Sequence, residues 1–335
     1  MMALDVGVAI DFAGGGEEPA ARLQRLKPVV RAAGELGYTG IWAGESYAAA
    51  SNWSLAFHTP NALMTLVRVA DWASTPVVGT ATLLAPAWDL FRLAHDTALA
   101  DQLVGGRLVV GMALGPKRLW ETRQVESADI GAAFEKTVTT LRDLWSGESV
   151  AFTGDDYVNG AVPLPAQPGG PPVWIGGGGS LAARRAAHLA EAYVASTGYP
   201  LQRVCRLAGE YWTFREGSGH VAANRMTVIA RSTSDAQARS QDGAVAVLHG
   251  YAEHGLWESD RHGRTTDEMI DDVALIGTPD HVLERVQHYA DVGVTGLQLR
   301  VAPGATTVTT AIETLERFQD EVLRYVVPNT RVLRA

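Results

Sequence analysis

The sequence predicts an α/β fold of the (β/α)8 type, a TIM barrel with insertions at its rim. Short runs rich in valine and isoleucine alternate with longer amphipathic stretches, which is typical of repeated βα units. About eight such runs occur, and nearly all are followed by a helix, as a closed parallel barrel requires. Because one barrel domain commonly has this length, residues 1–335 are predicted to form a single domain. Doubly wound open sheets alternate in the same way, so the choice of a barrel depends partly on the strand count.

The strands are expected where the apolar runs are short and rich in β-branched residues. They are residues 5–12, 39–45, 75–84, 108–114, 173–175, 192–197, 226–231 and 296–301. The helices are expected where the apolar residues recur with helical spacing. They include residues 19–36, 61–72, 90–104, 132–145 and 181–190, with residues 306–325 closing the chain. Gly37, Gly105 and Gly147 follow three of these helices, a position where glycine commonly ends a helix.

Two segments exceed what a minimal barrel needs. Residues 150–172 begin with a hairpin pattern at 150–158 and continue through a proline-rich bridge. Residues 256–278 are polar and separate two helices before the last strand. Both are interpreted as insertions at the barrel rim, where loops commonly cover a site.

Composition limits the partners of the chain. The net charge of -9 counts against nucleic acid or an anionic membrane as a partner, because phosphates repel an acidic surface. The single cysteine, Cys205, forms no internal disulfide, which fits a reducing cytoplasm. No apolar run approaches the roughly 20 residues of a membrane span. A cytoplasmic protein with a small-molecule substrate is therefore predicted.

The strongest local signal is a glycine-rich turn between a strand and a helix. Val173, Trp174 and Ile175 end a strand, four glycines follow, and Ser180 is expected to cap the next helix. Exposed amide N–H groups at a helix start form a ready phosphate site. The turn is neither a dinucleotide fingerprint nor a P-loop, because it lacks the acidic residue of the first and the Lys-Ser or Lys-Thr pair of the second. A plain tight turn remains the alternative.

Two further signals lie at strand ends that face the predicted mouth. Glu45, Ser46 and Tyr47 offer a carboxylate, a hydroxyl and a phenol at the end of the second strand. Small side chains at residues 79–82 would let a flat ring lie against the backbone of the third strand. A helix cap for Glu45 and tight core packing for residues 79–82 are the structural alternatives. No metal is predicted, since His249 and His254 lack a nearby carboxylate or a third ligand.

The pattern as a whole resembles the bacterial luciferase-like family of flavin- and deazaflavin-dependent oxidoreductases. The matching pieces follow the order of that family from the first strand to the last helix. They are residues 37–46 (GYTGIWAGES), 75–86, 100–103 with Gly106 and Arg107, 134–157, 172–180 and 276–279 with Gly293 and Val294. Together they are specific, whereas each one alone is weak.

This resemblance implies a barrel that holds the ring of FMN, or of the deazaflavin coenzyme F420, at the carboxyl ends of its strands. A non-prolyl cis peptide is implied near Ala81 and Thr82. The implied cofactor-binding residues are Thr80, Ala81 and Thr82 beside the ring, and Gly177, Gly178, Gly179, Ser180 and Thr197, with Ser196 as the alternative to Thr197, around the phosphate.

Three departures from the family pattern limit what the resemblance implies. Ser46 stands where a histidine usually follows the strand-two acid. Leu114 stands where FMN members often have a phosphate-binding arginine, and Pro116 where sugar-phosphate dehydrogenases have an acid. Neither luciferase chemistry nor sugar-phosphate oxidation is therefore predicted. Lys117 and Arg118 remain candidates for contact with a phosphate or a deazaflavin tail.

The predicted function is hydride transfer between coenzyme F420 and a small organic substrate, with Glu45, Ser46 and Tyr47 orienting the substrate or relaying a proton. The main alternative is a monooxygenase that uses FMNH2 and O2. The same pattern would also fit a barrel that binds flavin without turnover, or a phosphate-binding isomerase or aldolase. A homodimer is expected, from the resemblance and from the general frequency of dimers.

Overall fold

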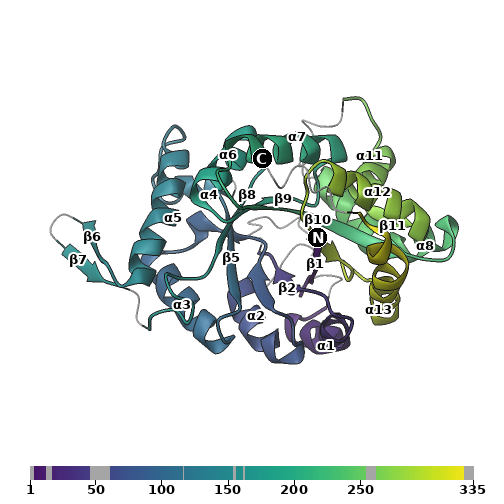
Figure 1. Ribbon diagram of the computed structural model, residues 1–335, viewed down its shortest axis with the longest axis horizontal. Coiled ribbons are helices and arrows are strands. Elements are labelled where there is room, and N and C mark those ends of the chain that lie inside the picture. Colours follow the sequence, from purple (N-terminus) through teal and green to yellow (C-terminus); the bar gives the residue numbers. More distant parts are fainter. Residues whose placement is uncertain are drawn as a thin grey trace.

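The computed structural model describes residues 4–12, 17–45, 61–115, 117–153, 156–160, 163–253 and 262–327. Within these residues, eight parallel strands pair in a closed cycle, β10-β12-β1-β2-β3-β5-β8-β9 and back to β10. The predicted (β/α)8 barrel is therefore confirmed (Figure 1). The strands are β1 Asp5–Ala9, β2 Gly40–Ala43, β3 Val77–Thr80, β5 Leu108–Ala113, β8 Val173–Gly176, β9 Ala192–Ala195, β10 His220–Ile229 and β12 Gly296–Arg300.

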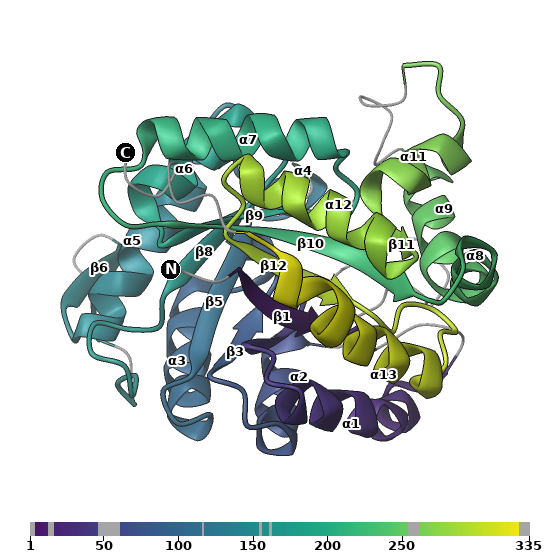
Figure 2. The ribbon, with the colours of Figure 1, turned by 45° about the vertical axis from the view of Figure 1, so that its right-hand side comes forward.

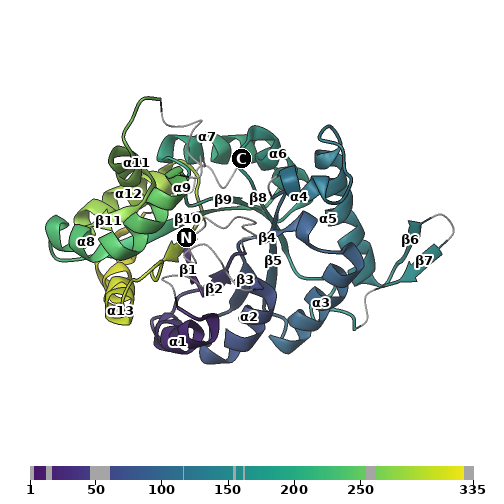
Figure 3. The ribbon, with the colours of Figure 1, turned by 180° about the vertical axis from the view of Figure 1, so that it is seen from behind.

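Helices surround the barrel of strands (Figures 1 and 3). They are α1 Pro19–Glu35, α2 Ala62–Val69, α3 Leu90–Leu103, α4 Lys117–Glu121, α5 Ile130–Ser146, α6 Ser180–Leu189, α7 Leu201–Phe214, α8 Thr233–Ser240, α9 Ala246–Glu253, α11 Thr266–Val273, α12 Pro279–Asp291 and α13 Val308–Arg317. Local sequence sets several of their ends. The side chains of Asn61 and Asp89 cap α2 and α3, and Gly147 ends α5 with a left-handed backbone at φ 87°. None of the helices in the described ranges is long and apolar enough to cross a bilayer.

Strand β10 differs from the prediction. It was expected at residues 226–231 but begins at His220, and residues 222–226 pair with β12 in the barrel wall. The expected segment instead pairs from Thr227 to Ile229 with the short strand β11 Leu275–Gly277, outside the barrel. The prediction missed the first half because His220, Ala222 and Asn224 are not a run of large apolar residues. Figure 2 shows β10 as the longest strand, running across the molecule.

The two predicted insertions have different structures. The first contains the expected hairpin, β6 Ser149–Thr153 and β7 Asp156–Asn159, which stands away from the barrel (Figure 1). The second was expected as a polar rim segment, but its described part contains α11 and β11. Thr265 and Glu268 form a capping box at the start of α11, which explains how so polar a segment begins a helix. The short strand β4 Leu83–Leu84 pairs with the end of β5.

Aromatic side chains pack together inside the barrel, in the half formed by the amino-terminal ends of the strands. The rings of Trp42 and Trp174 lie 4.5 Å apart, and that of His220 lies 4.8 Å from Trp174. Gly7 and Gly79 make room for Trp42, because a Cβ at either position would lie within 2.4 Å of its ring. We call Trp42, Trp174 and His220 the aromatic plug. Since the plug closes the amino-terminal half, chemistry in the barrel belongs at its carboxyl-terminal mouth.

Candidate active site

One half of the mouth is built from small residues on β5 and β8 and just after the ends of β2 and β3. A Cβ on Gly44 would lie 2.5 Å from the carbonyl oxygen of Ala81, and one on Gly111 would lie 1.9 Å from that of Thr80. On the next strand, a Cβ on Gly176 would lie 3.1 Å from Cγ2 of Thr82. We call Gly44, Ala81, Thr82, Gly111 and Gly176 the small-residue wall. The cis peptide expected near Ala81 and Thr82 joins these two residues.

Glu45 holds in place the backbone that follows β3. Its carboxylate is buried, and Oε1 accepts hydrogen bonds from the backbone N–H of Leu84 at 3.0 Å and from Nε1 of Trp88 at 2.7 Å. The backbone N–H of Glu45 also donates to the carbonyl of Thr82 at 3.3 Å. This predicted catalytic residue therefore anchors the wall. Ser46 and Tyr47, predicted beside it, lie outside the described residues.

The predicted ring-contact residues differ in exposure. The hydroxyl of Thr80 is buried and donates to the carbonyl of Gly111 at 2.9 Å, so it joins β3 to β5. Ala81 and Thr82 are half-buried at the mouth. The three residues therefore lie together with Glu45, and Thr82 also lies beside Gly176, where the glycine turn begins.

The glycine turn joins β8 to α6. Gly179, rather than the expected Ser180, is the N-cap residue, because Gly179 has extended backbone angles and Ser180 is already helical. The N-cap glycine has no side chain to cap this helix, and the first N–H groups of a helix lack the usual partner one turn earlier. Such groups and the helix dipole attract an anion.

Two arginines of α7 stand beside this turn. Arg203 donates to the carbonyl of Gly178 from Nη2 at 2.6 Å and from Nε at 3.1 Å, and its guanidinium stacks over the ring of Tyr199. Arg206 donates from Nη1 to the hydroxyl of Ser180 at 2.9 Å. The sequence-based prediction missed both arginines. Their spacing of three residues on the helix after β9 was a visible signal, but only the fold shows that α7 packs against α6.

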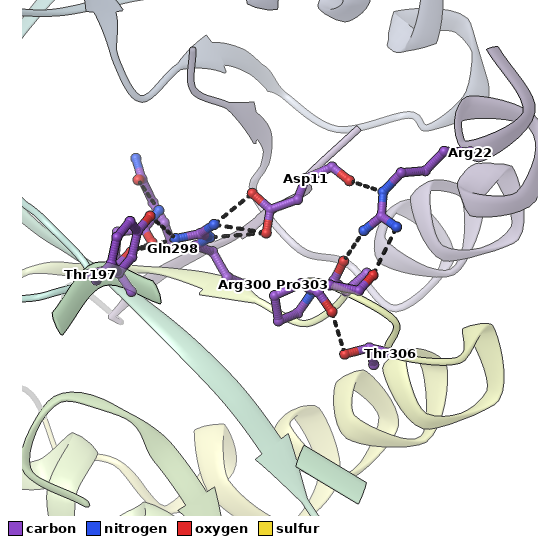
Figure 4. Close-up of polar contacts among 11 residues, drawn as sticks. Asp11, Arg22, Thr197, Gln298, Arg300, Pro303 and Thr306 are labelled. Carbon is purple, nitrogen blue, oxygen red and sulfur yellow. Dashed lines mark hydrogen bonds and ion pairs between the residues drawn. The ribbon is translucent and has the colours of Figure 1, made fainter. Parts of the chain in front are cut away.

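The opposite half of the mouth carries polar side chains on β10 and β12 and just after the ends of β9 and β1. Arg300 makes a two-pronged ion pair with Asp11, with Nη2 2.7 Å from Oδ1 and 2.8 Å from Oδ2 (Figure 4). Arg300 also donates from Nη1 to the hydroxyl of Thr197 at 3.1 Å and to that of Tyr251 at 3.0 Å. Burial acts to lower the pKa of Arg300, but the charge of Asp11 and the contact with Tyr251 raise it above its ordinary value. Arg300 is therefore a permanent cation with its counter-ion attached.

Two amides extend this cluster into the barrel. The hydroxyl of Thr197 donates to Oδ1 of Asn224, and Nδ2 of Asn224 donates to Oε1 of Gln298 at 3.2 Å. We call Asp11, Thr197, Asn224, Gln298 and Arg300 the polar wall. Of these residues only Thr197 was predicted from sequence. Its predicted role at the phosphate stays a prediction, and its hydroxyl is engaged by Asn224 and Arg300.

A second arginine fixes the backbone behind the polar wall. Arg22 of α1 is fully buried and donates to the carbonyl of Asp11 at 2.6 Å. It also donates to the carbonyls of Ala302 and Gly304, each at 2.8 Å (Figure 4). Because these carbonyls follow β1 and β12, Arg22 ties together the two strand ends that carry Asp11 and Arg300.

Other polar residues lie away from this site. His249 was expected without a carboxylate nearby, but its Nε2 lies 3.4 Å from Asp267, because α11 packs against α9. Lys117 forms an exposed ion pair with Glu121. Among the residues that the structure places, no group of three metal-ligating side chains occurs.

A cavity of about 590 Å³ lies at the end of β10, between α8 and α13. Its charged side chains largely pair with one another: Arg239 contacts Asp235 at 2.8 Å and also Glu313, and Arg317 contacts Glu321 at 2.7 Å. The cavity is outside the barrel and contains none of the predicted site residues. We therefore assign the site to the mouth.

Comparison with known proteins identifies the family of the chain. The family model described as luciferase-like monooxygenase matches residues 2–296. The chain belongs to this family. The predicted luciferase-like oxidoreductase is thereby confirmed, and the isomerase or aldolase alternative is not supported.

Individual relatives of this luciferase-like protein use two kinds of cofactor. An F420-dependent glucose-6-phosphate dehydrogenase of Rhodococcus hoagii is 25% identical, over 82% of this chain and 85% of the relative. The oxygenase component of a flavin-dependent trigonelline monooxygenase of Acinetobacter baylyi is 28% identical, but over only 42% of this chain and 39% of the relative. The oxygenating constituent of 3,6-diketocamphane monooxygenase from Pseudomonas putida, solved in complex with FMN, has a TM-score of 0.78 at 15% identity, covering 98% of this chain and 100% of that one. This last likeness shows the fold alone.

Proposed function

We propose that this protein transfers hydride between coenzyme F420 and a small organic substrate at the barrel mouth. The observation that supports the proposal is the placement of an anion site beside the small-residue wall. Gly176 belongs to the wall, and the next residues form the turn that meets Arg203 and Arg206. A cofactor with a flat ring and a phosphate tail needs both features next to each other.

The residues present fit such a cofactor. Gly178 lets two side chains of the site reach the turn, because a Cβ there would lie 2.5 Å from the hydroxyl of Tyr199 and 2.7 Å from Nη2 of Arg203. The N–H groups of residues 177–180 and the two guanidinium groups would hold the phosphate. The small-residue wall would support the ring, because it has almost no side chain atoms to keep a plane away from the backbone.

The bound deazaflavin would supply the hydride carrier, and the protein supplies position and proton handling. Because Leu84 and Trp88 both donate to one oxygen of Glu45, this residue holds the wall in place. The remaining predicted groups, Ser46 and Tyr47, would relay a proton to or from the substrate. Hydroxyls are weak acids at neutral pH, so this relay would run through water.

A monooxygenase that uses FMNH2 and O2 is the second candidate. The flavin-dependent relative and the FMN-bound structural neighbour support it. The F420-dependent relative favours the first candidate, since its match covers most of both chains. A homodimer stays a prediction in either case.

The two candidates are separated by titrating the purified protein with F420 and with FMN and then assaying each reduced cofactor with and without O2. The proposal predicts F420 binding and a change in the deazaflavin absorption band without oxygen. Product that forms only with FMNH2 and O2 would support the second candidate. Binding of a cofactor without turnover across a broad substrate panel would indicate the non-catalytic alternative.

The phosphate site is tested with Gly178→Ala, whose new methyl group displaces Tyr199 and Arg203. Gly209→Ala on α7 is the matched control, because its Cβ would meet no atom within 4 Å. Cofactor affinity should fall about tenfold or more in Gly178→Ala, a loss of about 1.4 kcal/mol, and stay unchanged in Gly209→Ala. Equal affinities in both variants would place the phosphate elsewhere.

A further inference from the structure

We infer that Gln298 donates a hydrogen bond to an uncharged carbonyl group of the substrate, so that the site takes neutral ketones or aldehydes in preference to carboxylates or phosphates. The inference rests on the proposed function, because it places the substrate over the same mouth. It concerns binding only and adds no step to the reaction.

The polar wall forms a hydrogen-bond chain with one direction. A guanidinium can only donate, so the hydroxyl of Thr197 accepts a hydrogen bond from Arg300 and donates one to Oδ1 of Asn224. Asn224 must then turn its NH2 group toward Gln298, whose Oε1 accepts. The end of the chain is therefore Nε2 of Gln298, a donor. Successive hydrogen bonds polarise one another, so the cation at the start strengthens the donor at the end.

That terminal donor is buried and has no acceptor. Gln298 is 1% exposed, and its Nε2 has no hydrogen-bond partner among the residues that the structure describes. A buried polar group without a partner is destabilising, because it has lost its hydrogen bonds to water and gained none in the protein. An acceptor that arrives with a ligand removes this cost, so the free donor favours a bound oxygen.

The location of Gln298 limits the direction of approach. Its neighbours in register are Gly7 on β1 and Asn224 on β10, so it lies within the barrel wall. Two residues earlier on the same strand, a Cβ on Gly296 would lie 2.6 Å from His220 of the aromatic plug. Because His220 of the aromatic plug lies on the Gly296 side of Gln298 and the neighbouring strands lie on both sides, we infer that an acceptor would approach Gln298 from the mouth.

The charge at the mouth argues for a neutral acceptor. Arg300 is the one cation of the polar wall, and Asp11 neutralises it through two short contacts. An anionic substrate would have to compete with Asp11 for Arg300 and would meet its repulsion. A carbonyl oxygen needs only a donor, which Gln298 supplies.

The test uses cyclohexanone, cyclohexanecarboxylate and glucose 6-phosphate as probes, each titrated into protein loaded with the oxidised cofactor that binds. No turnover of the ketone occurs with an oxidised cofactor, so binding is measured alone. Cyclohexanone should bind at least tenfold more tightly than either anion. Its carbonyl stretch, followed by infrared spectroscopy with a carbon-13 label, should lie at lower wavenumber in the wild type than in Gln298→Leu.

Two further variants keep the test decisive. Gln298→Glu retains the acceptor for Asn224 but replaces the donor, so it should also lose the infrared shift even if Gln298→Leu fails to fold. Gln237→Leu, an exposed position on α8, should leave both the binding and the stretch unchanged. Loss of Gln298 should weaken cyclohexanone binding about fivefold, as expected for one hydrogen bond of about 1 kcal/mol.

The outcomes separate this inference from the proposed function. If neither cofactor binds, the proposed function fails and this inference fails with it. If a cofactor binds but the anions bind as tightly as cyclohexanone, or no probe binds, only the inference is overturned. An identical carbonyl stretch in the wild type and Gln298→Glu would also overturn it and would mean that an enclosed water satisfies Nε2.

Discussion

The two halves of the barrel mouth differ in what sets their shape. The small-residue wall is shaped by missing side chains, since Gly44 and Gly111 let β2 and β5 approach the carbonyls of Ala81 and Thr80. The polar wall is shaped by side chains that are joined by hydrogen bonds, from Asp11 and Arg300 to Gln298. The first half therefore offers a surface, and the second offers directed hydrogen bonds. A flat cofactor needs such a surface, and a polar substrate needs such hydrogen bonds.

The largest effect is expected from breaking the ion pair of the polar wall. Asp11→Asn leaves the buried Arg300 cation without its counter-charge, and removing one partner of a buried pair costs about 3–5 kcal/mol. Urea unfolding should show a loss of about 3 kcal/mol, since Asp11 is 14% exposed. Asp11→Asn combined with Arg300→Met should recover part of it. A loss below about 1 kcal/mol would mean that the pair contributes like a surface pair.

A somewhat smaller effect is expected in the small-residue wall. Gly111→Ala places a methyl group 1.9 Å from the carbonyl oxygen of Thr80, so β3 and β5 must move apart. Overpacking of this kind costs about 1–3 kcal/mol. Urea unfolding of Gly111→Ala beside Gly209→Ala measures the difference. A Gly111→Ala variant as stable as the control would show that the wall tolerates side chains.

Glu45→Gln separates a positioning role from a catalytic one. The substitution keeps the shape of the side chain but removes the charge of the carboxylate that accepts hydrogen bonds from Leu84 and Trp88. This change should lower the free energy of unfolding by about 1–2 kcal/mol. Turnover should fall because the small-residue wall is held less firmly, and the dependence of turnover on pH should stay unchanged. Full stability with lost turnover and an altered pH profile would instead identify Glu45 as a proton donor or acceptor.

The smallest effect concerns the aromatic plug. Burial lowers the pKa of His220 despite the opposing charge of Asp5, so the folded protein binds fewer protons there than the unfolded chain. Stability from this group is therefore present above the ordinary pKa of about 6.5 and is lost as the pH falls below it. Thermal unfolding from pH 7.5 to pH 5.5 should decline less in His220→Gln than in the wild type. Parallel declines would show that other groups dominate this range.

Features that depend on neighbours in sequence were predictable. The glycine turn and the hairpin are each encoded within a few residues, and each was found in the structure. The cis peptide between Ala81 and Thr82, which the family resemblance implied, was found as well. Seven of the eight predicted strands also overlap the barrel strands along their length, because their apolar runs are continuous. The exception, β10, carries polar and small residues toward the interior in its first half.

Features that depend on distant pairing were not predictable. Asp11 and Arg300 are 289 positions apart, and Asn224 and Gln298 are 74 apart. Each is an ordinary polar residue in a strand until the closed barrel brings β10, β12 and β1 together. The same holds for Arg203 and Arg206, which reach the glycine turn only because α7 packs on α6. Sequence reasoning therefore found the small-residue wall but, apart from Thr197, missed the polar wall.

The central claim is that a cofactor lies on the small-residue wall with its phosphate at residues 177–180. Hydrogen exchange with mass spectrometry, with and without saturating F420 or FMN, tests it directly. A cofactor in this position should protect the amides at residues 81–84 and 177–182, with no change in the hairpin β6–β7. Protection confined to the cavity between α8 and α13, with none at the glycine turn, would contradict it.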